Sequence, residues 1–221
     1  EQEGIDVHYV DDPGYVPADV ESTLVVYTPA IPKDMHELVY VQEKGYRVIK
    51  RSRMLGEIAH GQRCMAVAGT HGKTTTSTLV SHIFTAAGEG CSAFLGGISK
   101  NYDSNLLISA NDVVVAEADE FDRSFLQLFP EIAVITPMDA DHLDIYGDEA
   151  HIREAFKSFA SQVSGTVIAK KGLDITSDDT KARIMTYAFA DASADFHAEP
   201  IERGHFNLHW PGGVLEDCVV G

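Results

Sequence analysis

The sequence has no apolar run that approaches the roughly 18 residues needed for a membrane-spanning helix. Its first residues also lack the charged and then apolar pattern of a secretory signal peptide. We therefore expect a soluble, cytoplasmic protein without a membrane partner. The chain opens with Glu1 rather than Met and closes at Gly221 directly after a strand-like run, so we further expect it to be cut from a longer protein.

Basic residues are also scarce. The 221 residues include 17 lysines and arginines against 34 aspartates and glutamates, which gives a formal net charge of −17. A chain this acidic repels nucleic acid and anionic membranes, which argues against both as partners. Any anionic ligand must therefore be held locally, by backbone N–H groups, a lysine and a metal ion.

Cysteine is limited to Cys64, Cys91 and Cys218, which are scattered and form no CxxC pair. Each lies in an apolar, strand-like stretch, which favours a buried small hydrophobe over a disulfide or a zinc site. This usage suits a reducing cytosol.

One stretch organises the rest of the chain, MAVAGTHGKTTT at residues 65–76. An apolar run stops at Gly69, and after a tight polar turn a helical pattern begins at Lys73. Gly69 and Gly72 allow the backbone to bring its N–H groups close to an anion. Lys73 can reach a β- or γ-phosphate, and the Thr74 hydroxyl can bind a magnesium ion. The usual phosphate loop has four residues between its glycines and this one has two, yet the pattern predicts a phosphate site rather than a capped helix followed by a chance lysine.

The sequence predicts an α/β fold, with a mostly parallel sheet and covering helices. From Arg183 onward short strands follow one another without helices, which indicates an antiparallel edge. His60-Gly61-Gln62 is the expected linker, so we place one unit at 1–61 and a second at 62–221. Asp34 is expected to cap the first helix. The expected strands are 24–28, 46–50, 65–68, 91–95, 112–118, 132–136 and 166–169, and the expected helices are 34–44, one from Ser52, 73–87 and 148–163.

Glu117 and His142 each follow a buried strand, as the phosphate loop does. Because ligands of open parallel sheets bind at the carboxyl ends of strands, we expect Thr74, Glu117 and His142 to face one crevice and to surround Mg²⁺. Magnesium prefers oxygen ligands, so the imidazole is the unusual member of this set. The alternatives are a solvated charge for Glu117 and, for His142, a loop histidine satisfied by its acidic neighbours in 139–144.

Two classes of function remain on these residues alone. One is an ATP-using enzyme that transfers the γ-phosphoryl group to an acceptor, and the other is a nucleotide-gated switch or binding module. A switch would need a guanine-reading motif such as NKxD, which is absent. The sequence also has no nucleophile elbow and no HExxH motif.

Five motifs, taken together, resemble the Mur ligase family. They occur in that family's order: VVYTPAIP at 25–32, VAGTHGKTTT at 67–76, FLGGI at 94–98, VVVAEADEFDRSFL at 113–126 and DADHLDIYG at 139–147. The resemblance covers essentially the whole chain, with strong motifs from residue 25 to 160 and weak ones after Arg183. The resemblance implies a three-domain enzyme. Residues 1–61 would be the second half of a Rossmann-like UDP-substrate domain and 62–221 an incomplete central P-loop domain, so this chain alone is expected to be inactive as a ligase.

The members that the chain resembles most join L-alanine to the lactyl carboxylate of UDP-N-acetylmuramate, a step of peptidoglycan precursor synthesis. The resemblance implies ATP and Mg²⁺ as cofactors, with an acyl phosphate as the intermediate. Two alternatives remain open, a ligase of the same family that attaches a preformed peptide to the same sugar, and an idle nucleotide-binding module.

The resemblance also assigns residues to the site. It implies Lys73, Glu117 and His142 as catalytic, with Thr74 and Glu117 on one magnesium and His142 with Glu117 on a second. The implied nucleotide-binding residues are Gly69, Thr70, His71, Gly72, Lys73, Thr74 and Thr75. The implied substrate contacts are Asp119, Glu120, Arg123 and Ser124 along the sugar, Asn105 at the end of the glycine pair's loop, and Thr28, Ala30 and Ile31 near the UDP diphosphate.

Three positions depart from the family pattern or invite comparison with it. Pro137 stands where the family commonly has asparagine, and Asp103 replaces a usual glycine before Asn105. Several relatives hold the second magnesium with a carbamylated lysine. Lys157 lies at a comparable distance after His142, and we interpret it as a solvated helix charge.

Overall fold

The computed structural model describes residues 4–138 and 149–219. The chain divides into two compact units, Glu1–Ile58 and Ala59–Gly221. The predicted boundary lay between residues 61 and 62. The assignment of the two units to a UDP-substrate domain and an ATP-binding domain stays a prediction.

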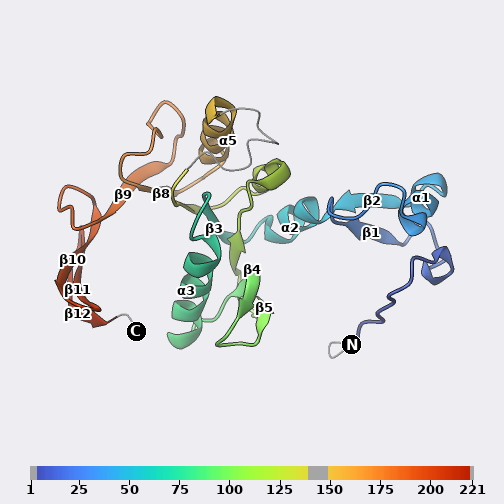
Figure 1. Ribbon diagram of the computed structural model, residues 1–221, viewed down its shortest axis with the longest axis horizontal. Helices are drawn as coiled ribbons and strands as arrows, with labels where there is room; N and C mark the ends of the chain where they lie inside the picture. The colour runs from blue at the N-terminus through green and yellow to red at the C-terminus, as the bar shows by residue number, and fades with distance from the viewer. Residues whose placement is uncertain (1–3, 139–148, 220–221) are drawn as a thin grey trace. The chain divides into compact units, whose positions relative to one another are not determined.

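Among its described residues, the first unit contains one pair of parallel strands, β1 (Leu24–Tyr27) and β2 (Arg47–Lys50). Val25 of β1 lies opposite Val48 of β2, and the buried Leu38, Val41 and Tyr46 pack against this pair. The Tyr46 hydroxyl donates a hydrogen bond to the carbonyl of Pro17 at 2.7 Å. The elements are the 3-10 helix η1 (Pro13–Tyr15), β1 (Leu24–Tyr27), α1 (His36–Glu43), β2 (Arg47–Lys50) and α2 (Arg51–Ala59), which runs into the second unit (Figure 1).

The cap of α1 differs from the prediction. Asp34 was expected to cap this helix, but α1 begins at His36, and the carboxylate of Asp11 accepts the N–H groups of His36 at 2.8 Å and Glu37 at 2.9 Å. These two backbone hydrogen bonds, that from Glu37 above all, hold the pKa of Asp11 below its usual value. The Asp34 prediction was wrong because the cap comes from a residue that is distant in sequence.

The second unit is built on one sheet, which confirms the predicted α/β class. Among the described residues this sheet has ten strands in the order β12-β11-β10-β9-β8-β7-β3-β6-β4-β5. Its strands and helices are β3 (Arg63–Ala68), α3 (Lys73–Ala86), β4 (Ser92–Ser99), β5 (Ser104–Leu107), β6 (Val113–Glu117), the 3-10 helix η2 (Phe121–Gln127), β7 (Ile132–Ile135), α5 (Glu149–Ser161), β8 (Thr166–Lys170), β9 (Arg183–Phe189), β10 (Phe196–Glu202), β11 (His205–Trp210) and β12 (Gly213–Val219).

The sheet is parallel from β4 through β6, β3, β7 and β8 to β9 and β10, and antiparallel at both edges. The antiparallel edge that the sequence predicted is present, but it begins at β11 rather than at β9. At the other edge β5 pairs antiparallel with β4, where the sequence had indicated only a polar loop. Because β5 is short and polar, its pattern gave no strand signal.

The central strands are buried almost completely, as expected for a parallel sheet covered on both faces. Helix α3 packs on β3, β4 and β6 (Figure 1). It turns the fully buried Ser77 and Ser81 inward, and their hydroxyls are satisfied by the helix carbonyls of Lys73 and Ser77. Two apolar residues of this helix, Leu79 and Ile83, are instead 56% and 65% exposed.

The cysteines agree in part with their predicted role. Cys64 and Cys91 are buried, and burial raises the pKa of the Cys64 thiol to about 12, which keeps it protonated and unreactive. Cys218 is half-buried. None of the helices in the described ranges combines the length and the apolar character required to cross a bilayer.

Candidate active site

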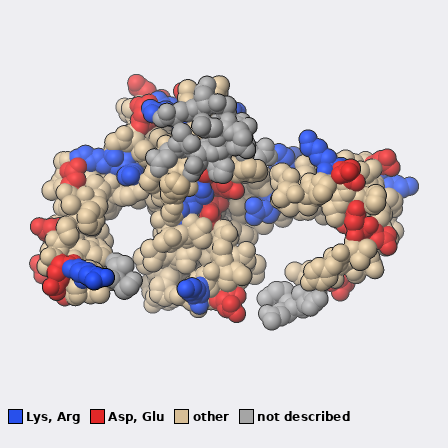
Figure 2. Space-filling model, viewed as in Figure 1, with Lys and Arg blue, Asp and Glu red and all other residues tan. Residues whose placement is uncertain are grey.

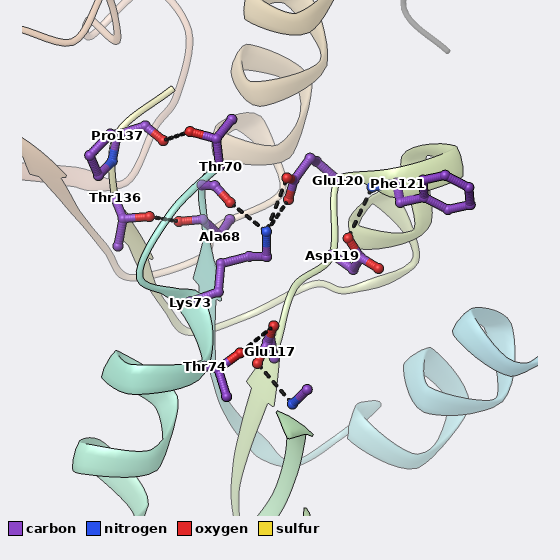
Figure 3. A network of polar contacts seen from close by, with 12 residues as sticks. Ala68, Thr70, Lys73, Thr74, Glu117, Asp119, Glu120, Phe121, Thr136 and Pro137 are labelled. Atoms are coloured by element: carbon purple, nitrogen blue, oxygen red, sulfur yellow. Dashed lines mark hydrogen bonds and ion pairs between the residues drawn. The ribbon is translucent and has the colours of Figure 1, made fainter. Parts of the chain in front are cut away.

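The phosphate loop is the four-residue connection between β3 and α3, and it is fastened to the end of β7 (Figure 3). The N–H and the hydroxyl of Thr70 both donate to the carbonyl of Pro137 at 2.8 Å. The hydroxyl of Thr136 donates to the carbonyl of Ala68 at 3.0 Å. Hydrogen bonds to the residues that follow β7 therefore hold the loop in place.

Two glycines are required by the shape of this loop. A Cβ atom on Gly69 would lie 1.9 Å from the hydroxyl oxygen of Thr136, and the φ angle of Gly69 is +131°. Gly72 is the N-cap of α3 and has left-handed backbone geometry, with φ at +82°. Both conformations favour glycine, which explains why the loop carries it at these positions.

The structure gives a physical reading of two departures from the family pattern. Pro137 contacts the loop through its backbone carbonyl, so this contact does not depend on the side chain that the family commonly has there. Asp103 has left-handed geometry with φ at +49°, which is the conformation that glycine adopts most easily and that aspartate tolerates.

Lys73, the first residue of α3, points its ammonium group back across the loop. Its Nζ donates to the carbonyl of Gly69 at 2.8 Å and to Oε1 of Glu120 at 3.0 Å, and it lies 2.8 Å from Oε2 of the same carboxylate. Glu120 is almost completely buried, with 1% of its side chain exposed, and Lys73 is 13% exposed. Figure 3 shows this ion pair beside the loop.

Glu117, the last residue of β6, is held between two donors. The Thr74 hydroxyl donates to Oε1 at 3.1 Å and the backbone N–H of Gly96 donates to Oε2 at 2.8 Å. The structure thus brings Thr74 and Glu117 together, whereas His142, the third residue expected in this crevice, lies outside the described residues. The contact with Gly96 was not predicted, although the FLGGI motif at 94–98 marked the segment that supplies it.

A Cβ atom at Gly96 would fall 2.4 to 2.6 Å from the carboxylate atoms of Glu117. At the neighbouring Gly97 it would meet only the methyl carbon of Thr74, at 3.5 Å, which is an ordinary contact. Glycine at position 96 therefore leaves the room that the carboxylate of Glu117 occupies.

The segment that follows β6, which includes η2, packs against α5. The ring of Phe125 packs against Phe156 and Phe159, with ring centroids 5.2 and 5.0 Å apart. The side-chain amide of Gln162 donates to the carbonyls of Leu126 and Leu128 at 3.1 and 2.8 Å. These contacts fix η2 and, with it, the residues at its N-terminal end.

The residues that the resemblance placed along the sugar lie just before η2 and within it, and one of them, Glu120, is almost completely buried against Lys73. Asp119 is half-buried, and its Oδ1 accepts the N–H of Phe121 at 3.1 Å. Arg123 is exposed and has left-handed backbone geometry with φ at +56°, while Ser124 is half-buried. Left-handed geometry at a residue other than glycine is uncommon and clusters at ligand-binding positions. Their role along the sugar stays a prediction.

The remaining predicted site residues are exposed, belong to the first unit or lie outside the described residues. His71, Thr75 and Asn105 are exposed, and His142 lies outside the described residues. Thr28, Ala30 and Ile31 belong to the first unit, where the N–H of Ile31 donates to the carbonyl of Thr28 at 3.2 Å in a turn. Within 4–138 and 149–219 there is no cluster of three His, Cys, Asp or Glu residues that could hold a metal ion.

Lys157 is an ion-paired residue rather than the solvated charge that we predicted. Its Nζ lies 3.1 Å from Asp174 and 3.5 Å from Asp179, and the side chain is 25% exposed. The hydrogen bond with Asp174 is the main reason that the pKa of Lys157 lies above its usual value. Since carbamylation requires the neutral amine, these contacts argue against a carbamylated lysine at this position.

Charge on the surface agrees with the scarcity of basic residues. On the face shown in Figure 2, lysine and arginine atoms form small separate groups and not one continuous basic area.

Comparison with known proteins gives two family matches along the chain. Residues 67–216 match the Mur ligase middle domain, and residues 1–63 match a model described as Mur ligase family, catalytic domain. The sequence is 54% identical over 224 residues to the UDP-N-acetylmuramate–L-alanine ligase of Flavobacterium psychrophilum, covering 100% of this chain and 49% of the relative. It is 47% identical over 231 residues to the enzyme of the same name from Porphyromonas gingivalis, covering 100% and 51%.

Among solved structures, the fold is similar to that of UDP-N-acetylmuramate-alanine ligase from Thermotoga maritima. The TM-score is 0.79 at 23% identity, over 98% of this chain and 50% of that one. The chain thus spans about half the length of the curated relatives that it matches.

Proposed function

The chain belongs to the Mur ligase family, and from this premise we propose that it forms the nucleotide-binding core of an ATP-dependent ligase. The proposed reaction joins L-alanine to the lactyl carboxylate of UDP-N-acetylmuramate in peptidoglycan precursor synthesis. The specific substrates are suggested by relatives named UDP-N-acetylmuramate–L-alanine ligase, to which the chain is 42 to 54% identical. The observation that carries the site assignment is the convergence of Lys73, Thr74 and Glu117 beside one glycine-rich loop.

The side chains of Thr74 and Glu117 are suitable ligands for magnesium. The Thr74 hydroxyl and the Glu117 carboxylate lie 3.1 Å apart and offer the oxygen ligands that magnesium prefers. When bound, the ion would neutralise charge on the nucleotide phosphates. His142, which the resemblance adds to the set, keeps its predicted role as a ligand of a second ion.

In the proposed first step, the lactyl carboxylate attacks the γ-phosphorus of ATP, the bond to the bridging oxygen breaks, and ADP leaves. Backbone N–H groups of the loop and the Lys73 ammonium hold the phosphates in line with the carboxylate. In the second step the amine of L-alanine attacks the acyl carbonyl, and inorganic phosphate leaves as the amine loses its proton. The donors around the loop then stabilise the negative charge on the departing phosphate.

The other proposed contacts follow the same scheme. Asp119, Arg123 and Ser124 are proposed to lie along the sugar, and Asn105 at the end of the β4–β5 connection. Thr28, Ala30 and Ile31 of the first unit are proposed to approach the UDP diphosphate. Within the second unit, ATP and the lactyl carboxylate are proposed to bind beside the carboxyl ends of β3 and β6.

A ligase assay tests the proposed function. A protein of the relatives' full length that contains this chain is expected to form ADP and phosphate only when UDP-N-acetylmuramate and L-alanine are both present, with one amide product per ATP. Activity with a preformed peptide but not with L-alanine would instead support the peptide-attaching ligase. ATP consumption that needs neither substrate would overturn the proposal. The 221-residue chain by itself is expected to form no amide product.

A further inference from the structure

The ammonium group of Lys73 is already paired with a carboxylate before any phosphate arrives. Its Nζ donates hydrogen bonds to the Gly69 carbonyl at 2.8 Å and to Oε1 of Glu120 at 3.0 Å, and it lies 2.8 Å from Oε2 of the same carboxylate in an ion pair. A phosphate that binds in the loop must therefore share this ammonium with Glu120 or displace it from the carboxylate.

Glu120 is the fixed partner of the pair. It is the N-cap residue of η2, its carbonyl accepts the N–H of Arg123 at 3.0 Å, and η2 is fastened to α5 through Phe125. Only 1% of the Glu120 side chain is exposed. Lys73 begins a helix and carries its charge on a flexible four-carbon stem. When a phosphate binds, the group that changes partner is therefore Lys73.

The charges beside the loop indicate that Glu120 competes with a bound phosphate for Lys73 and does not help the phosphate to bind. Together, Lys73 and Glu120 carry no net charge, and Glu117 adds a further negative charge nearby. The charged side chains around the loop thus add little net attraction for a polyanion, although they include the lysine that such a ligand needs.

We propose that Glu120 competes with the nucleotide phosphate for Lys73 and so limits how tightly the loop holds ADP. Glu120 acts here as a positioning residue, through Lys73, and this role rests on the proposed nucleotide binding at the loop. When product phosphate or ADP leaves, Lys73 returns to the carboxylate of Glu120. The pair therefore favours product release, a step that often limits turnover in enzymes.

The test is the affinity of this chain for Mg·ADP, measured by calorimetry in the Glu120→Gln variant. The amide keeps the size and one acceptor oxygen of the glutamate but removes its charge. The variant releases the Lys73 ammonium from a charged partner and leaves it for the phosphate. A hydrogen bond between charged groups is worth about 10- to 100-fold in affinity, so the variant is expected to bind ADP tighter by that factor. Glu131→Gln removes one charge at the opposite end of β3, where Glu131 pairs with Arg63, and is expected to change the affinity by about twofold or less.

A double-mutant comparison identifies Lys73 as the intermediary. In a Lys73→Met background, the gain from Glu120→Gln is expected to fall to a small fraction of its value in the unmodified chain. Glu120→Asp, which withdraws the carboxylate by one methylene group, is expected to tighten ADP binding less than Glu120→Gln does. Circular dichroism and urea unfolding show whether each variant is folded. If Glu120→Gln does not fold, Glu120→Asp takes its place in the affinity measurement.

The outcomes separate this inference from the proposed function. Weaker or unchanged ADP binding in Glu120→Gln and Glu120→Asp, with binding lost in Lys73→Met, would overturn the competition while leaving the nucleotide site standing. The same gain with and without Lys73 would overturn the route through Lys73. Equal ADP binding in the unmodified chain and in Lys73→Met, or none in either, would remove the nucleotide site and the competition with it.

Discussion

Replacing Glu117 with alanine is expected to lower the turnover of the proposed ligase, assayed at the relatives' full length, by about 10²- to 10³-fold, the loss typical when one preorganised charge-stabilising group is removed. Glu117 is half-buried at the end of β6, and its two carboxylate oxygens are aligned by the Thr74 hydroxyl and the Gly96 N–H. Alanine removes the charge and both oxygens from the proposed magnesium site while leaving these two donors behind.

The measurement is steady-state turnover with UDP-N-acetylmuramate, L-alanine and ATP, together with the far-ultraviolet circular dichroism spectrum. The spectrum is expected to stay unchanged, because Glu117 ends its strand and takes no part in the buried core. Asp112→Ala is the matched control, since it removes a carboxylate from the exposed residue just before the same strand. Near-normal turnover in Glu117→Ala would remove this residue from the mechanism.

Gly96→Ala is expected to lower turnover by about 10²-fold without a large change in stability. The added methyl group would lie 2.4 to 2.6 Å from the carboxylate of Glu117, so the two cannot keep their positions. The backbone of Gly96 does not have a positive φ angle, and alanine is therefore tolerated by the chain itself. The carboxylate is the end of a flexible side chain, so it moves aside, and this displacement costs function rather than folding.

Gly97→Ala provides a matched control for this variant. Its methyl group would meet only the Thr74 methyl carbon at 3.5 Å, and turnover is expected to stay within about threefold of normal, the effect of a change below about 0.7 kcal/mol. Comparable turnover in the two glycine variants would show that the space beside Glu117 is not used as the structure indicates. A large loss of stability in Gly96→Ala would contradict the account in a different way, by showing that the backbone resists the change.

The parts of the site that follow local rules could be predicted from the sequence. A strand, a glycine-rich turn and a helix with lysine at its first position fix the loop, because each depends only on neighbouring residues. The rule that parallel strands end at one edge brought Thr74 and Glu117 together, and their oxygens lie 3.1 Å apart. This prediction required only that the strands be parallel.

Contacts that depend on packing could not be predicted in this way. The Lys73–Glu120 pair forms because η2 turns Glu120 inward, and the conformation of η2 depends on aromatic packing against α5. The cap of α1 comes from Asp11, which lies 25 residues before the N–H group that it binds. The Gly96 N–H reaches Glu117 because β4 and β6 are adjacent, a pairing that sequence alone left open.

The central claim is that the loop around Lys73 binds the phosphates of ATP, and calorimetric titration of Mg·ATP into this chain tests it most directly. The titration is made on the unmodified chain and on Lys73→Met, which keeps most of the side chain's volume but removes its charge. We expect measurable binding to the unmodified chain and an affinity lower by about 100-fold in the variant, as the loss of a charge-assisted phosphate contact implies. Equal affinity in the two proteins would contradict the claim.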